Sequence, residues 1–298
     1  MKQFRVIVLL AAAFFLFSSC SINRMAVRAV GKALSSAGGG TLFTGDDDPE
    51  LIGDALPLAL KLYEGLLSQD PTNADLLLTA GIGFISYANA FVQTPASMLP
   101  DSAFEEQKEA YARAKKLYLR GRNYLLQGLD SVHPGFAALF ETGDIDAALA
   151  MTERGDASFL YWTAAGWLSA ISLDLFDFAL TMDAYKAVAL AVRALELDES
   201  FGEGSLHELF ISLYGGIPEH MLYRPYVAGA ADPVRETLAA YYETAAPGIA
   251  TMKEKALHHF GRAVELSKGL KASPFLSFAS AFSRSEEHTS ELQSRVDI

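Results

Sequence analysis

The amino-acid sequence predicts an all-α fold in which degenerate helical hairpins pack into a solenoid-like or compact helical domain. Alanine and leucine are abundant in a chain with 51% hydrophobic residues, and the apolar residues do not follow the alternating pattern of strands. Helix–turn–helix patterns also return along the chain without a fixed period. We therefore expect a repeat-like body rather than a regular solenoid.

Residues 1–19 have the features of a cleaved signal peptide. Two basic residues precede an uncharged apolar run from Val6 to Phe17, and small residues then lead to Cys20. This run is shorter than the roughly 20 residues that a transmembrane helix needs. We therefore expect export and cleavage rather than a membrane-spanning segment.

Cys20 is the predicted site of lipidation, because the segment from Leu16 to Cys20 resembles a lipobox. An N-terminal acyl anchor would hold the protein on the periplasmic side of a bacterial membrane. Ser21 follows the cysteine, and analogy with other lipoproteins then favours the outer membrane over the inner one. Residues 20–45 contain three consecutive glycines and are predicted to be a lipidated N-terminus and flexible tether.

Residues 284–298 are expected not to be native. From Arg284 to Ser294 the chain resembles the translation of a common sequencing-adapter oligonucleotide, so we interpret this tail as an artefact. The predicted helical domain is therefore residues 46–283.

The chain is acidic, with a formal net charge of −12. This charge predicts no nucleic-acid partner and no electrostatic adhesion to anionic lipid, which leaves membrane contact to the acyl anchor. Because the chain has one cysteine, it forms no internal disulfide, and its stability must come from packing.

The first helix of the body is predicted to begin at Pro49. Asp48 is placed to cap it, and proline is favoured in the first turn of a helix. Three consecutive aspartates could instead bind calcium, but the spaced ligands of a calcium loop are missing, so we favour the cap. Further along, Leu58, Leu62, Leu66 and Leu67 share an apolar helical face, and Pro57 is expected to start or kink the helix.

A turn over Asp70–Asn73 separates this helix from a second one over residues 74–92. This arrangement has the form of a tetratricopeptide-like hairpin. Small residues in the second helix are expected to let the helices approach closely: Ala80, Gly81 and Gly83.

Similar helix–turn–helix patterns return over residues 187–216 and 256–282. Between the first two hairpins, the sequence predicts a long charged amphipathic helix over residues 104–128 and shorter elements over residues 135–153. An aromatic helix over residues 159–167 then carries both tryptophans of the chain.

Three stretches together resemble a known family: residues 48–67, Leu160-Tyr161-Trp162 and residues 202–208. They are similar to the T component of tripartite ATP-independent periplasmic (TRAP) transporters, the TatT lipoprotein family, over roughly residues 44–282. The resemblance implies a periplasmic lipoprotein that is often a homotrimer, with cryptic tetratricopeptide-like helices and a hydrophobic channel or pocket. It also implies that the partner is the periplasmic solute-binding protein of the transporter.

We therefore predict a lipid-anchored periplasmic accessory protein that docks a solute-binding protein and could pass a hydrophobic small molecule to it. Stacked helical hairpins suit this role because they present extended surfaces to protein partners. The alternative is a generic envelope scaffold lipoprotein that mediates protein–protein assembly.

No sequence pattern for catalysis is present. The chain has no His-Glu-x-x-His helix, no Cys/His cluster and no Gly-x-Ser-x-Gly elbow. The sequence therefore predicts no enzyme, no cofactor and no metal site.

Aromatic residues are the candidate ligand-binding or partner-binding residues. Aromatic side chains on a helix either fill the core or line an apolar pocket, and core packing is the more common case. An isolated histidine is likewise more often structural than functional. The candidates are Tyr161, Trp162, Trp167, His207 and Tyr214. Weaker candidates for an amphipathic binding rim are Tyr87, Tyr214, Tyr223, Tyr226, Tyr241 and Tyr242.

Overall fold

The computed structural model describes residues 46–223 and 232–282. Helices make up 79% of the structure, and these residues contain no strand. The all-α prediction is confirmed. The predicted signal peptide, Cys20, the tether and the adapter-like tail lie outside the described residues.

Eight longer helices build the body within the described ranges, joined by short helices and turns. They are α3 (Pro49–Leu67), α4 (Ala74–Ala88), α6 (Phe104–Val132), α9 (Ala157–Ser172), α11 (Ala184–Leu197), α12 (Ser205–Gly216), α13 (Pro233–Ala245) and α14 (Met252–Leu266). The shorter ones are α5 (Thr94–Ser97), α7 (Phe136–Thr142), α8 (Ile145–Ala150) and α10 (Phe178–Thr181). A last helical stretch covers residues 273–282.

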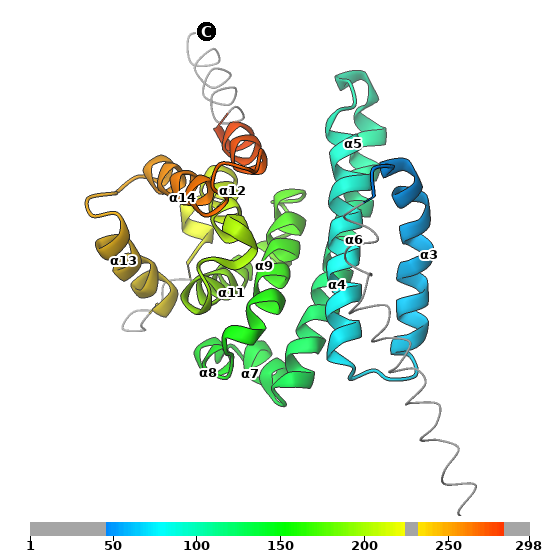
Figure 1. Cartoon of the computed structure of the whole chain (residues 1–298), viewed down its shortest axis with the longest axis horizontal. Coiled ribbons are helices and arrows are strands. Elements are labelled where there is room, and N and C mark those ends of the chain that lie inside the picture. The colour runs from blue at the N-terminus through cyan, green and yellow to red at the C-terminus, as the bar shows by residue number, and fades with distance from the viewer. Residues whose placement is uncertain (1–45, 224–231, 283–298) are drawn as a thin grey trace, which may run out of the picture.

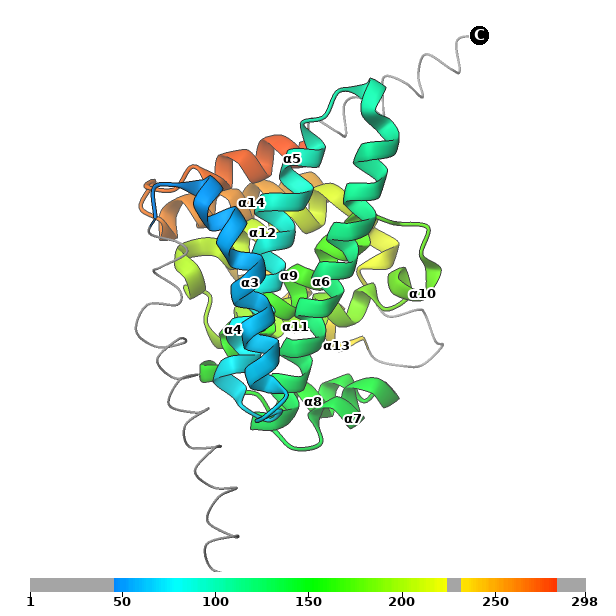
Figure 2. The ribbon, with the colours of Figure 1, turned by 90° about the vertical axis from the view of Figure 1, so that its right-hand side faces the viewer.

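The longer helices follow one another across the molecule. Each of α3, α4, α6, α9 and α11 packs against the next, and α12, α13 and α14 lie beyond them (Figure 1). Seen from the side of α3, the first three of these helices form a layer in front of the others (Figure 2). The long helix α6 therefore joins the first hairpin to the rest of the chain.

The first hairpin begins and turns where the sequence predicts. Asp48 caps α3 by accepting a hydrogen bond from the Leu51 amide at 3.0 Å, and Asn73 caps α4 by accepting one from the Leu76 amide at 3.2 Å. Pro57 does not start the helix, since α3 runs continuously from Pro49 to Leu67.

The apolar face predicted for α3 is buried only at its end, where Leu67 is 6% exposed. Leu58 and Leu62 are 65% and 58% exposed, whereas a second stripe that includes Leu56, Leu60 and Tyr63 is buried against α4 and α6. Both stripes have helical spacing, so periodicity alone could not choose between them. The partner helices determine which stripe is buried, because Leu60 and Tyr63 pack in one apolar cluster with side chains of α4.

Helix α4 is apolar enough to resemble a membrane span. In the part of the chain that the structure describes, residues 74–97 are long and apolar enough to cross a membrane. Half of their most apolar stretch is nevertheless buried inside the fold. Its fully buried side chains include Leu76 and Leu77. The segment is therefore placed as a core helix between α3 and α6.

The later hairpins are looser versions of the predicted ones. Helices α11 and α12 occur as expected, but α12 packs most extensively on α14. Between α11 and α12 the chain turns through left-handed backbone at Gly202, Glu203 and Gly204, which redirects α12. In the last pair, the Phe260 ring of α14 lies 5.1 Å from the Phe275 ring in the final helix. The tetratricopeptide-like character stays a prediction.

The backbones of α4 and α6 come into direct contact where they cross. A Cβ atom added to Gly81 would lie 2.4 Å from Leu125 Cγ, and one added to Gly121 would lie 2.7 Å from the Gly81 carbonyl oxygen. Such distances are below van der Waals contact, so this approach requires glycine on both helices. Gly81 thus allows a close approach, but to α6 rather than to the hairpin partner α3; within the hairpin it is Gly83 whose added Cβ would meet Leu60 of α3, at 2.7 Å.

We expect Gly121→Ala to lower the free energy of unfolding by about 1–3 kcal/mol, because the added methyl group must push two backbones apart. Urea denaturation followed by circular dichroism measures this change. The matched control is Gly65→Ala in α3, where an added Cβ meets no atom within 4 Å. That variant should be neutral or up to about 1 kcal/mol more stable. Equal midpoints for the two variants would contradict the close crossing.

Candidate functional site

The three aromatic candidates of α9 lie in packed surroundings. Tyr161 and Trp162 are half-buried, and their ring centroids are 5.2 Å apart in a T-shaped contact. Tyr161 also packs against Phe201, with centroids 5.1 Å apart. Trp167 is 5% exposed and is covered by the Arg122 guanidinium at 4.5 Å from its ring. These contacts support core packing rather than a ligand surface.

The other two candidates, His207 and Tyr214, belong to a buried polar network. They lie two turns apart on α12 and therefore share one face of that helix. His207 Nδ1 is 2.7 Å from Nδ1 of His259 on α14, and both histidines are fully buried. The Tyr242 hydroxyl on α13 lies 2.8 Å from His259 Nε2 and 2.7 Å from the Tyr214 hydroxyl. The network thus joins three helices.

Both buried histidines are neutral at neutral pH. Burial lowers the pKa of His207 to about 4, and burial together with the neighbouring histidines lowers the pKa of His259 well below its ordinary value. Two facing Nδ1 atoms can share one proton, so one ring donates and the other accepts.

The outer end of the network suggests which ring donates. His207 Nε2 faces the Glu199 carboxylate at 3.3 Å, within ion-pair distance but poorly aligned for a hydrogen bond. A carboxylate only accepts, so assigning the His207 proton to Nε2 leaves its Nδ1 as the acceptor for His259. Glu199 is held in turn by Arg262, whose Nε donates to it at 3.0 Å. A polar chain therefore runs from the surface at Glu199 to Tyr242.

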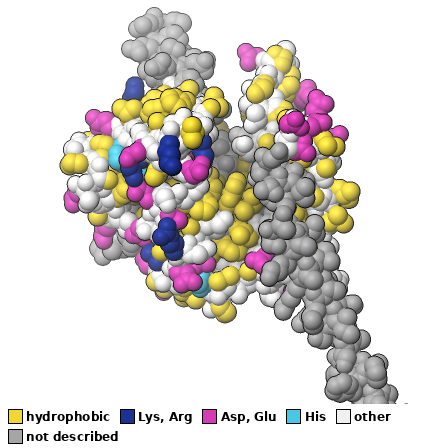
Figure 3. All heavy atoms as spheres, in the orientation of Figure 1, with side chains coloured by type: hydrophobic (Ala, Val, Ile, Leu, Met, Phe, Trp, Pro, Cys, Tyr) yellow, Lys and Arg dark blue, Asp and Glu magenta, His cyan; other side chains and the backbone are white. Residues whose placement is uncertain are grey.

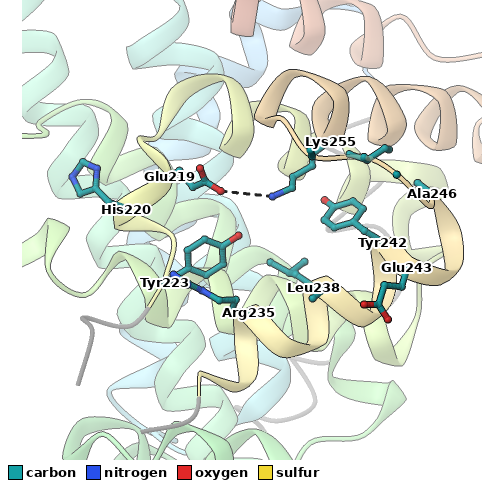
Figure 4. Close-up of a pocket in the computed structure, with 13 residues that line it drawn as sticks. Glu219, His220, Tyr223, Arg235, Leu238, Tyr242, Glu243, Ala246 and Lys255 are labelled. Atoms are coloured by element: carbon teal, nitrogen blue, oxygen red, sulfur yellow. Dashed lines mark ion pairs between the residues drawn. The ribbon is translucent and has the colours of Figure 1, made fainter. Parts of the chain in front are cut away.

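A cavity of about 840 Å³ lies on the other side of Tyr242. It is bounded by the turn Glu219–Met221, by α13, by residues 246–250 and by the start of α14. Tyr223 and Tyr242 stand on either side of it with Leu238 between them (Figure 4). The ring of Tyr242 thus lines the cavity, and its hydroxyl belongs to the buried network.

Charged groups of both signs line this cavity. Lys255 Nζ lies 3.7 Å from Glu219 Oε1 and 5.6 Å from the centre of the Tyr242 ring. The Arg235 guanidinium covers the Tyr223 ring at 4.4 Å, and Glu243 adds a second acid to the lining. Burial and the nearby Glu219 raise the pKa of Tyr223, and burial and Tyr214 raise the pKa of Tyr242, so both tyrosines stay neutral.

Sequence reasoning found part of this site. Tyr223 and Tyr242 were predicted only as weaker rim candidates, yet they line the cavity, whereas Tyr87 stacks on Phe91 at 5.7 Å in the first hairpin. Tyr226 lies outside the described residues. The charged lining residues, Glu219, Arg235 and Lys255, were missed. Charged residues are common on helix surfaces, so their convergence shows only in three dimensions.

Exposed apolar side chains gather at two further places. Figure 3 shows hydrophobic groups over the end of the described chain, where Leu257, Leu270, Phe275 and Leu276 are more than half exposed. The second place is the loop around α10, where Phe176, Phe178 and Met182 are 86%, 73% and 67% exposed. Clustered exposed apolar side chains mark sites of interaction.

Comparison with known proteins identifies the family. The model of the TRAP transporter T-component family matches residues 45–222. The chain belongs to this family. It is also 37% identical over 230 residues to an uncharacterized protein of Treponema pallidum (strain Nichols), which covers 72% of this chain and 71% of that protein.

Family membership gives the chain an accessory role in a TRAP transporter, with membrane association in a bacterium. The family is a transporter component rather than an enzyme family. The matched range ends at Leu222, so α13 and α14, which complete the cavity, follow it in the chain.

The buried histidines should make stability fall in acid. An unfolded histidine takes up a proton near pH 6.5, whereas folded His207 does so near pH 4, and burial holds the pKa of folded His259 well below its ordinary value as well. Between these values the unfolded state holds more protons, so the free energy of unfolding falls as the pH falls. Each histidine contributes at most about 1.4 kcal/mol per pH unit. Urea titrations at about pH 7 and about pH 5 measure the loss.

The matched variants are His207→Gln and His220→Gln. The first removes one of the two buried titrating groups and should shrink the acid-induced loss by roughly half. The second replaces an exposed histidine and should leave the loss as in the wild type. The same loss in all three proteins would show that the pair does not control the pH dependence.

Proposed function

We propose that the protein is a lipid-anchored periplasmic component of a TRAP transporter that docks the solute-binding protein of the transporter and exchanges a solute with it. The observation that carries this proposal is the family match over residues 45–222. The leader ending at Cys20 supports the anchor, and the acidic body leaves membrane contact to the lipid. A homotrimer, as the resemblance implies, is part of the same proposal.

The loop around α10 is the docking surface in this proposal. It lies within the matched residues and presents Phe176 and Phe178 to solvent. Exposed aromatic side chains are the usual energetic centres of protein interfaces. A second cavity beside the loop, of about 570 Å³, combines apolar side chains such as Phe104 and Leu173 with three lysines, so it adds both apolar and basic surface.

Two ion pairs hold this loop against α6. Lys115 Nζ lies 2.8 Å from an Asp174 oxygen and 2.6 Å from an Asp177 oxygen. Burial lowers the pKa of Lys115, but the two carboxylates outweigh this and raise it. Asp177 also caps α10 through the Leu180 amide at 3.2 Å. The aromatic side chains are thus presented on a fixed support, which reduces the entropy lost on binding.

The solute site in this proposal is the cavity between Tyr223 and Tyr242. Its volume of about 840 Å³ falls in the range of small-molecule sites. Because its lining combines apolar and charged side chains, it suits a solute with both apolar and polar parts.

We expect Phe176→Ser combined with Phe178→Ser to weaken binding of the solute-binding protein encoded with the transporter by about tenfold or more. Biolayer interferometry with the full chain in detergent measures the affinity. Leu62→Ser is the matched control, since Leu62 is an exposed apolar residue of α3, and it should bind as the wild type does.

Three results would overturn parts of this proposal. Absence of binding by the wild type would remove the docking role. A loss caused by Leu62→Ser instead of the phenylalanine variant would move the docking surface to α3. Capture of outer-membrane assembly factors, without the solute-binding protein, would favour the generic envelope scaffold.

A further inference from the structure

Two acids and two bases line the cavity beside α13. Glu219 and Lys255 face each other at one end, while Arg235 and Glu243 both come from α13. A purely anionic ligand at Lys255 would meet Glu219, and a purely cationic ligand at Glu219 would meet Lys255. A ligand that carries both charges avoids either repulsion.

The Glu219–Lys255 pair is built so that it can open. Its atoms are 3.7 Å apart, and the Glu219 side chain is 58% exposed while that of Lys255 is 13% exposed. Lys255 is also held over the faces of Tyr214 and Tyr242, at 5.7 and 5.6 Å from their centres. The ammonium group is therefore fixed by its aromatic neighbours, and the carboxylate can move aside into solvent.

The middle of the cavity is apolar. Tyr223 and Tyr242 form opposite walls, and Leu238 lies between them (Figure 4). Because burial raises the pKa of both tyrosines, their rings remain neutral and present apolar faces. Such a slot accepts a branched or aromatic side chain, and the rest of the volume leaves room for bridging waters.

We propose that this cavity binds a free α-amino acid with an apolar or aromatic side chain. Its carboxylate pairs with Lys255, its ammonium group pairs with Glu219, and its side chain lies between Tyr223 and Tyr242. Binding replaces one loose ion pair by two charge-assisted contacts. The inference rests on the proposed function only in treating this ligand as the solute.

The test is isothermal titration of the full chain in detergent with L-phenylalanine and with two analogues that keep the aromatic group. Phenethylamine lacks the carboxylate, and 3-phenylpropionate lacks the ammonium group. We expect L-phenylalanine to bind and both analogues to bind at least about tenfold more weakly, because each leaves one member of the opened pair without a partner. Equal binding of either analogue, or no binding of L-phenylalanine and L-leucine, overturns the proposal.

Two variants locate the site. Glu219→Gln should weaken L-phenylalanine binding by about tenfold while leaving 3-phenylpropionate binding unchanged or tighter, since the variant removes only the partner of the ammonium group. Glu236→Gln is the matched control, because Glu236 is an exposed acid of α13 outside the lining of the cavity, and this variant should bind as the wild type does. Equal losses in the two variants would overturn the assignment of Glu219.

This experiment is separate from the test of docking. Titration uses no solute-binding protein, and the docking variants at Phe176 and Phe178 lie on other elements. Docking without amino-acid binding would leave the accessory role standing and remove the ligand class. Amino-acid binding without docking would support the ligand class and remove the docking role.

Discussion

The cavity depends on one contact, the hydrogen bond between His207 and His259. Two neutral imidazole rings that share a proton must keep a defined orientation, and this orientation sets how α12 and α14 cross. His259 then holds the Tyr242 hydroxyl at 2.8 Å, which positions α13. Since α13 supplies Tyr242 and Leu238 to the cavity and α14 supplies Lys255, the shape of the binding slot depends on a polar contact buried behind it.

Docking and solute binding use different parts of the chain in the function proposed here. The loop around α10 lies inside the range that the family model matches, whereas α13 and α14 follow it. A protein built in this way can keep its docking surface while the helices that line the cavity change. Solute preference can then diverge among relatives that keep the same partner class, because the two surfaces share no side chain.

The sequence contained enough information for the fold class and the helix starts, but less for the site. Asp48 could be recognised as a cap, and the turn that ends at Asn73 as a helix boundary, because both depend on local sequence. The buried stripe of α3 could not be identified from the sequence, because Leu58 and Leu62 have the same spacing as Leu56 and Leu60. Which stripe is covered depends on α4 and α6, and that is tertiary information.

The site shows the same limit more strongly. His207 and Tyr214 could be named as candidates from the sequence, yet nothing local pairs His207 with a histidine 52 positions away. Lys255 and Glu219 are ordinary surface types in sequence, and their role shows only in three dimensions, where Lys255 lies over the Tyr242 ring and faces Glu219. Aromatic candidates were partly recognisable because large rings must pack or bind somewhere, whereas charged ones were not.

The crossing of α4 and α6 has a consequence for ancestry. At Gly121 the space beside the Cα atom is already filled by the Gly81 carbonyl oxygen, which no side-chain exchange can remove. Leucines in the neighbouring core can be exchanged for other apolar residues of similar volume with small loss, but this glycine cannot. Among distant descendants of the same ancestor, the glycine of α6 should therefore outlast the hydrophobic residues around it and serve as a marker of descent where overall identity has faded.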